Sequence, residues 1–259
     1  MRDDGLDRAI DAAGGIARLA RKIGISQPSV SNWTRVPAQR VIAVELATGI
    51  PRNDLRPDLY SEQAVSPELV DPVDAARAQE YALLATLLSA PPSRRLLDRL
   101  AALTGDATPL GRAHVTLADA ASSAVATKIE REYFDLFVGL GRGELLPYAS
   151  YYLTGFLNER PLSRLRADLA RLGIERIANN PEPEDSAAIL CEIMSGLADG
   201  HFGVSPEAQR AFFENHVSPW MGRLFADIES AGNARFYRAV GALGRTFIGI
   251  ETEAFTFAN

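Results

Sequence analysis

The amino-acid sequence predicts an all-α protein that consists of a small N-terminal domain and a larger helical bundle. Three observations predict this fold. Apolar residues recur every three or four positions through most of the 259 residues, no run alternates apolar and polar residues as a strand would, and leucine and alanine are frequent. The hydrophobic content of 47% is enough to bury one large core or two smaller ones.

Charge divides the chain near residue 60. Residues 1–60 contain nine Arg or Lys and seven Asp or Glu, whereas the remaining residues carry a net charge of −8. Such segregation is expected of a segment with an anionic partner, although a chance cluster on a solvated face gives the same pattern. We predict a domain at residues 1–60, a linker at 61–76 that contains two prolines and four acidic residues, and a domain at 77–259.

The composition also indicates the compartment. No apolar run is long enough to span a bilayer, and the first residues lack the apolar stretch of a secretory signal. The single cysteine, Cys191, excludes an internal disulfide, and the three histidines are too scattered for a metal triad. We therefore expect a cytoplasmic protein without a metal or another cofactor.

The first element expected along the chain is a helix-turn-helix at residues 15–34. Four apolar residues give its first helix an inner face, and Gly24 permits the tight turn that follows. Ser26 is a favourable N-cap for the second helix, in which Val30 and Trp33 are expected to face the core. The outward residues carry amides, hydroxyls and a guanidinium, which suit base edges and phosphates in a major groove. These candidate DNA-binding residues are Gln27, Ser29, Ser31, Asn32 and Arg35.

The segment from Gly14 to Tyr60 resembles the Cro/YdaS family of small DNA-binding regulators. The resemblance rests on the helix-turn-helix, on Val36-Pro37-Ala38-Gln39-Arg40-Val41, and on the tail from Ala47-Thr48-Gly49-Ile50 to Arg56-Pro57-Asp58-Leu59-Tyr60. It implies DNA binding through residues 15–40, and a homodimer is one expectation because helix-turn-helix modules usually act as dimers. The alternative is a degenerate module that serves only for dimerisation or docking.

Seven amphipathic helices are expected in the larger domain. Their apolar stripes lie at residues 82–88, 96–103, 125–137, 162–172, 189–197, 220–228 and 236–247. Glycines and prolines end several of them, as at Pro91-Pro92 and Gly173. The glycines at 139, 141 and 143 are expected to form a flexible loop, which is not a phosphate-binding loop because no strand precedes it and no Gly-Lys-Ser/Thr follows.

Four elements of this domain, taken together, resemble the TorD/DmsD/NarJ family of cytoplasmic molybdoenzyme chaperones. They are Glu132-x-x-x-Leu136-Phe137 with Val138-Gly139, Leu146-Pro147-Tyr148-x-Ser150-x-Tyr152, Glu182-Pro183-x-Asp185, and His216-x-x-x-Trp220. The resemblance covers about residues 77–259. It implies a helical bundle that binds a twin-arginine signal peptide or the apo-form of a molybdoenzyme, without catalysis and without a cofactor. Ser186 stands where the family has histidine, which weakens the implied guanine-nucleotide contact.

The candidate client-binding residues follow from these elements. Carboxylates accept bidentate guanidinium contacts, tyrosine faces stack on arginine or receive apolar side chains, and the −8 charge favours encounter with a cationic peptide. Acidic groups before a helix are also explained by its dipole alone. The residues are Tyr148, Ser150, Tyr152, Glu182, Pro183, Glu184, Asp185 and Glu192.

The sequence thus predicts a chaperone, not an enzyme, that binds the signal peptide or apo-form of a molybdoenzyme such as a formate dehydrogenase or a related oxidoreductase. Its DNA-binding module would couple maturation to transcription. A transcriptional regulator that senses a ligand through a TorD-like effector domain is the main alternative. A hydrolase built on Glu182, Asp185 and His216 is a third hypothesis, which no residue spacing supports.

Overall fold

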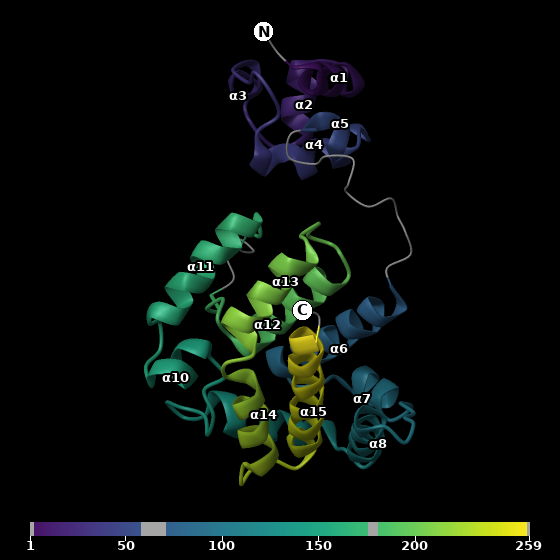
Figure 1. Cartoon of the computed structure of the whole chain (residues 1–259), viewed down its shortest axis with the longest axis vertical. Coiled ribbons are helices and arrows are strands. Elements are labelled where there is room, and N and C mark those ends of the chain that lie inside the picture. The colour runs from purple at the N-terminus through teal and green to yellow at the C-terminus, as the bar shows by residue number, and fades with distance from the viewer. Residues whose placement is uncertain (1–2, 58–70, 176–180, 258–259) are drawn as a thin grey trace. The chain divides into compact units, whose positions relative to one another are not determined.

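The chain is built of helices that form two compact units (Figure 1). The computed structural model describes residues 3–57, 71–175 and 181–257, and no β-strand occurs within these ranges. The units comprise Met1–Leu69, called the N-terminal unit below, and Val70–Asn259, called the C-terminal unit. The prediction of an all-α fold is confirmed for the described residues. None of the helices described there combines the length and the apolar character that crossing a bilayer requires.

The N-terminal unit packs short helices around one small core. Its helices are α1 (Asp4–Ala13), α2 (Ile16–Lys22), α3 (Gln27–Ser31), the 3₁₀ turn η1 (Ala38–Arg40), α4 (Val41–Thr48) and α5 (Arg52–Leu55). The α1 helix packs against α2, α4 and α5. The fully buried side chains of this core include Leu6, Leu19, Val30 and Leu55. Burial of these side chains stabilises helices that are too short to persist alone.

The C-terminal unit is a larger bundle. Its helices are α6 (Pro72–Ser89), α7 (Arg94–Leu100), α8 (Pro109–Ser122), α9 (Ala126–Tyr133), the π-helical turn η2 (Phe134–Val138), α10 (Ala149–Thr154), α11 (Arg160–Leu172), α12 (Ala187–Ala198), α13 (Pro206–Phe212), the π-helical turn η3 (Phe213–Val217), α14 (Met221–Ser230) and α15 (Phe236–Phe257). The α6 helix packs along α12, and α15 lies against α14 and α8. Aromatic residues in the centre of this core, among them Tyr81, Trp220 and Tyr237, are almost completely buried.

Helices α1 and α8 lie outside the ranges that apolar periodicity predicts. The buried face of α8 consists of Leu117 and small residues, including Gly111 and Ala113, and the buried face of α1 is similarly rich in glycine and alanine. The small side chains leave no leucine stripe in α8, so periodicity does not reveal that helix. The α1 helix was not predicted, although its buried residues Leu6, Ala9, Ile10 and Ala13 keep the helical spacing.

The predicted linker, residues 61–76, lies mostly outside the described residues. Residues 72–76 of this predicted linker instead form the first turn of α6. Pro72 occupies the first helical position, and the Asp71 carboxylate accepts the Val73 N–H at 2.8 Å. Both features favour a helix start, since proline lacks the N–H that would go unpaired there.

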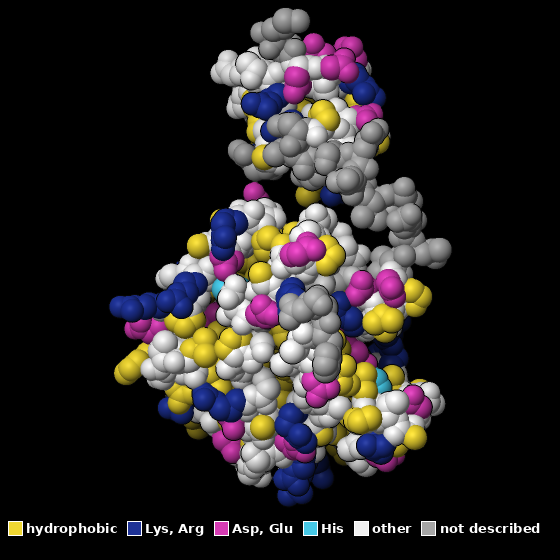
Figure 2. Space-filling model, viewed as in Figure 1, with side chains coloured by type: hydrophobic (Ala, Val, Ile, Leu, Met, Phe, Trp, Pro, Cys, Tyr) yellow, Lys and Arg dark blue, Asp and Glu magenta, His cyan; other side chains and the backbone are white. Residues whose placement is uncertain are grey.

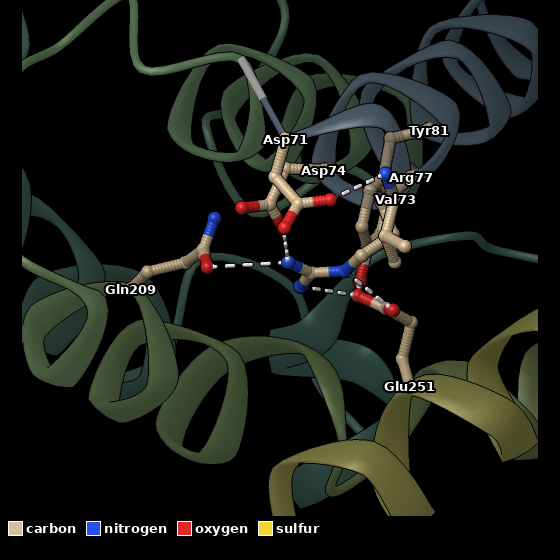
Figure 3. A network of polar contacts seen from close by, with 7 residues as sticks. All are labelled: Asp71, Val73, Asp74, Arg77, Tyr81, Gln209 and Glu251. Carbon is tan, nitrogen blue, oxygen red and sulfur yellow. Dashed lines mark hydrogen bonds and ion pairs between the residues drawn. The ribbon is translucent and has the colours of Figure 1, made fainter. Parts of the chain in front are cut away.

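A buried ion pair joins the first turns of α6 to the end of α15 (Figure 3). Two nitrogens of Arg77 donate to the two carboxylate oxygens of Glu251, each at 2.8 Å, and Tyr81 donates to the same carboxylate at 2.9 Å. Arg77 also donates to Asp74 at 2.6 Å and to Gln209 at 3.4 Å. Glu251 is only 1% exposed, so this carboxylate depends on these three donors for its stability in the fold.

Candidate functional site

A pocket of about 670 Å³ opens in the C-terminal unit. Its walls come from α6 and α12, from α9 and η2, and from the segments that precede α10 and α12. It is lined by Ala82, Ala85, Thr86, Leu88, Ser89, Tyr133, Phe137, Val138, Pro147, Tyr148, Pro181, Glu182, Ser186, Ala188, Ile189, Glu192 and Ser195. The lining mixes apolar, aromatic and acidic side chains, and it includes no Lys, Arg or His among the described residues. This composition favours a ligand that has both a positive charge and apolar groups.

Two segments that are far apart in the sequence form one wall of the pocket. Tyr148 and Ser186 make an isolated antiparallel bridge. Ala149 N–H donates to the Asp185 carbonyl at 2.9 Å, and Ala187 N–H donates to the Pro147 carbonyl at 2.8 Å. These bonds hold the Leu-Pro-Tyr segment against the start of α12, and they bring two of the four family-like elements together.

Glu182 and Glu192 are the acidic side chains of the lining. Burial raises the pKa of Tyr148, and a hydrogen bond with Glu182 raises it further. Burial, with the nearby Glu182 charge, also raises the pKa of Tyr133. Both phenols therefore stay protonated at neutral pH. The Tyr148 hydroxyl shares the Glu182 carboxylate with any ligand that binds there.

Glu184 and Asp185 do not line the pocket, because the fold uses their carboxylates internally. Glu184 is buried and pairs with Arg166 of α11, with N–O distances of 2.8 and 3.0 Å. Asp185 is buried and accepts the Ser150 N–H at 2.8 Å. Ser150 Oγ and Asp185 Oδ1 have no hydrogen-bonding partner among the described residues. The acidic cluster expected from the sequence is thus divided: Glu182 contacts the pocket, and its two neighbours stabilise the loop.

The remaining candidates are also distributed between pocket and core. Glu192 of α12 is exposed at the pocket, whereas Pro183 is half-buried outside the lining. Tyr152 donates to Asp227 at 2.8 Å and packs on Trp220 with ring centroids 5.4 Å apart. The structure therefore brings Tyr148, Glu182 and Glu192 together, and it gives Tyr152 a packing role.

The candidate residues named from the sequence did not include the lining residues of α9 and η2. Phe137 and Val138 reach it from η2, where the Gly139 N–H donates to the Phe134 carbonyl at 2.7 Å, a bond across five residues. Such π-helical turns often occur at functional sites. The Tyr133 and Phe137 rings lie with centroids 5.2 Å apart, tilted by 59°. Both residues line the pocket, so the stripe expected to be core is partly a pocket wall.

Glu132, the first residue of its motif, is a helix cap and not a pocket residue. Its carboxylate accepts three backbone N–H groups at the start of α15, from Arg235 at 2.8 Å, Phe236 at 3.2 Å and Tyr237 at 2.7 Å. Negative charge is favoured at this end of a helix. The motif glutamate therefore stabilises the bundle.

The helix-turn-helix of the N-terminal unit has the expected geometry. Gly24 adopts a φ of 70°, Val30 is buried, and Trp33 packs on the core. Ser26 occupies the N-cap of α3, but its hydroxyl pairs with Ser29 Oγ at 2.8 Å and does not cap the helix. The candidate DNA-binding residues are all exposed: Gln27, Ser29, Ser31, Asn32 and Arg35. Three exposed basic residues of α2 lie beside them in the sequence, Arg18, Arg21 and Lys22.

The imidazoles of His216 and His114 pair with carboxylates. Buried His216 lies 2.7 Å from Asp168, and burial lowers the pKa of this imidazole. His114 pairs with Glu80, and their hydrogen bond raises the pKa of His114. In the part of the chain that the structure describes, no group of three or more His, Cys, Asp and Glu side chains is arranged to hold a metal ion.

Two family models match the chain. Residues 103–226 match the model described as nitrate reductase delta subunit, and residues 6–64 match the model described as bacterial toxin YdaS. These matches confirm both resemblances that the sequence motifs indicate.

Individual relatives are also similar to this chain. The chaperone protein TorD of Aliivibrio fischeri is 27% identical over 136 residues, which cover 49% of this chain and 63% of the relative. TorD of Vibrio cholerae is 28% identical over 130 residues, 47% of this chain and 59% of the relative. TorD of Shewanella loihica is 23% identical over 206 residues, 71% of this chain and 94% of the relative. The chain thus spans about six tenths of the length of the first two relatives. Their names are those of chaperones and not of catalysts, in agreement with the expectation of a non-enzyme.

One solved structure is also similar. It is described as a candidate redox enzyme maturation protein from Archaeoglobus fulgidus, is 17% identical, and aligns with a TM-score of 0.46 over 67% of this chain and 93% of that chain.

Proposed function

Since its C-terminal unit is similar to the nitrate reductase delta subunit and TorD chaperones and its N-terminal unit to YdaS, we propose that this chain is a cytoplasmic maturation chaperone with a DNA-binding module. The C-terminal unit binds the twin-arginine signal peptide or the apo-form of a molybdoenzyme, such as a formate dehydrogenase or a related oxidoreductase. The protein holds this client and performs no covalent chemistry on it.

The observation that carries the proposal is the composition of the pocket. Glu182 and Glu192 offer two carboxylates, Tyr133, Phe137 and Tyr148 offer aromatic faces, and no described lining residue is basic. Carboxylates bind guanidinium groups through paired hydrogen bonds, and aromatic rings accept both guanidinium planes and apolar side chains. A segment that joins arginines to apolar residues matches all of these features.

Calorimetric titration of the full chain tests the proposal. The probe is a synthetic peptide with two adjacent arginines followed by an apolar stretch. We expect Glu182→Gln and Glu192→Gln each to weaken binding about tenfold, because a hydrogen bond to a charged group contributes about 1.5–3 kcal/mol. Glu253→Gln, which removes an exposed charge on α15 outside the pocket lining, is the matched control and should bind as the wild type does. Absence of binding to several such peptides, together with failure to co-purify any molybdoenzyme subunit, would refute the proposal.

The N-terminal unit is proposed to bind DNA through α3 and Arg35. The exposed amides and hydroxyls of α3 can reach base edges, and the neighbouring basic residues can contact phosphates. Fluorescence anisotropy of a labelled duplex with the full chain at about 50 mM salt is the test, since non-specific binding is strongest at low salt. Adding the arginine-rich peptide to the same sample shows whether client binding changes DNA affinity. A homodimer, expected of such modules, would give two half-sites per operator.

The pocket volume supports a second candidate function. At about 670 Å³ the pocket lies in the range that small ligands occupy, about 300–1,000 Å³. The chain would then be a transcriptional regulator whose TorD-like unit senses a small molecule. Native mass spectrometry of the purified protein separates the two candidates: a co-purified small molecule that the arginine peptide does not displace favours the regulator.

A further inference from the structure

The loop after η2 displays the most exposed large apolar side chain among the described residues. Leu140 is 95% exposed and lies between Gly139 and Gly141. An exposed leucine gains no stability from its own fold, and exposed apolar side chains are common on protein surfaces, as the yellow side chains on the C-terminal unit in Figure 2 illustrate. The backbone of this loop and its position next to the pocket point to a specific contact for Leu140.

Backbone hydrogen bonds join both ends of this loop to η2, in the segment that its three glycines were expected to make flexible. Beyond the bond across η2, Glu144 N–H donates to the Asp135 carbonyl at 3.1 Å, and Leu145 N–H donates to the Leu136 carbonyl at 2.8 Å. The glycines are required by this shape. Gly139 and Gly141 adopt φ values of 63° and 87°, which other residues rarely adopt, and a Cβ on Gly139 would lie 2.0 Å from the Arg142 carbonyl oxygen.

The loop starts at the rim of the pocket. Val138 lines the pocket, is 50% exposed, and is two residues from Leu140. An apolar rim thus adjoins a pocket whose ionisable lining groups include two carboxylates and no base among the described residues. Arg142, two residues after Leu140, is engaged with Tyr151 through a hydrogen bond of 3.0 Å and a ring contact at 5.5 Å.

We propose that Leu140, together with Val138, is the contact that selects the apolar stretch of the client peptide while the pocket carboxylates bind its cationic residues. This inference deepens the proposed function and rests on it. The occupant follows from continuity and charge, because a chain that places cations beside Glu182 and Glu192 can leave the pocket past Val138, and an apolar side chain is the favourable partner for Val138 and Leu140 there. The backbone hydrogen bonds at both ends of the loop limit the entropy lost when the contact forms.

Binding of two peptides to the full chain tests this proposal. The first peptide carries two arginines followed by an apolar stretch, and the second carries the same arginines followed by serines. Leu140→Asp should weaken binding of the first peptide about tenfold and change binding of the second by less than about twofold. Leu140→Met should restore binding, because methionine has a similar volume and stays apolar. Leu46→Asp, an equally drastic change at a leucine that is 83% exposed on α4, is the matched control.

The outcomes separate this proposal from the one on which it rests. Equal losses for both peptides, or no loss for either, would overturn the role of Leu140, and the effects of Glu182→Gln and Glu192→Gln would still stand. Absence of wild-type binding to both peptides would overturn this inference, and failure to co-purify any molybdoenzyme subunit as well would overturn the proposed function. Sedimentation equilibrium addresses a second copy of the chain as the competing occupant: if Leu140→Asp abolishes self-association and leaves peptide affinity unchanged, the rim is a dimer contact and the proposal fails.

Discussion

Replacing Glu132 should destabilise the bundle and leave the pocket functional. This glutamate belongs to a family-like motif, so a role in client binding is the obvious guess, but its carboxylate accepts the N–H groups of Arg235, Phe236 and Tyr237. We therefore predict that Glu132→Ala lowers the free energy of unfolding and does not change the affinity for the arginine peptide.

The magnitude follows from the burial of the three donors. Phe236 and Tyr237 are buried, so two of the N–H groups lose their acceptor where water has poor access, while Arg235 is exposed and can be rehydrated. An unpaired buried donor costs about 1–3 kcal/mol, and loss of the charge at a helix N-terminus costs about 0.3–1 kcal/mol. Glu132→Ala should therefore cost about 3 kcal/mol. Glu132→Gln keeps an acceptor oxygen and loses the charge, so it should cost about 1 kcal/mol.

Urea unfolding measures both values. Trp220 lies in the core of the C-terminal unit, so its fluorescence in a Trp33→Phe background reports that unit alone. Glu130→Ala changes an exposed glutamate of the same helix and should unfold as the parent does. If Glu132→Ala and Glu130→Ala unfold at the same urea concentration, the capping argument is wrong.

Three further predictions follow from other groups. Glu251→Gln should lower the free energy of unfolding by about 3 kcal/mol, because it leaves the Arg77 guanidinium without its buried counter-charge, and a change below about 1 kcal/mol in urea unfolding would contradict this. The hydrogen bond with Glu80 raises the pKa of His114 above 6.5, so the stabilisation by this pair is complete below pH 6.5 and is lost as pH rises through the raised value. The loss of stability on His114→Gln should accordingly be larger near pH 6 than near pH 9, and an equal loss at both would refute the assignment. Arg35→Ala should weaken duplex binding and reduce the slope of log affinity against log salt by about one unit, and an unchanged slope would exclude a phosphate contact.

Most of the fold could be predicted from the sequence because helix periodicity is local. The stripe at 162–172 corresponds to α11, and the stripe at 189–197 lies within α12. The π-helical turn η2 could not be foreseen, since one extra residue in a turn leaves the apolar spacing nearly unchanged. Because Phe137 continues the apolar stripe at 125–137, it was expected in the core, but it lines the pocket.

The candidate site was only partly predictable. The sequence indicated Tyr148, Glu182 and Glu192, which line the pocket together, and it equally indicated Glu184 and Asp185, whose carboxylates the fold uses internally. Neighbouring residues in a loop without a repeating pattern point in unrelated directions, so chemistry and spacing do not distinguish them. Partners such as Arg166 are brought close by packing and are not visible in the local sequence.

The sequence by itself determined the all-α character, the division of charge near residue 60 and the two family resemblances, because composition, apolar period and motifs are properties of short segments. Only the tertiary structure decided which carboxylates face the pocket and which stabilise the bundle. That choice depends on the bridge between Tyr148 and Ser186 and on the capping of α15 by Glu132, contacts between residues that lie 38 and about 100 positions apart. Such contacts form when the helices pack.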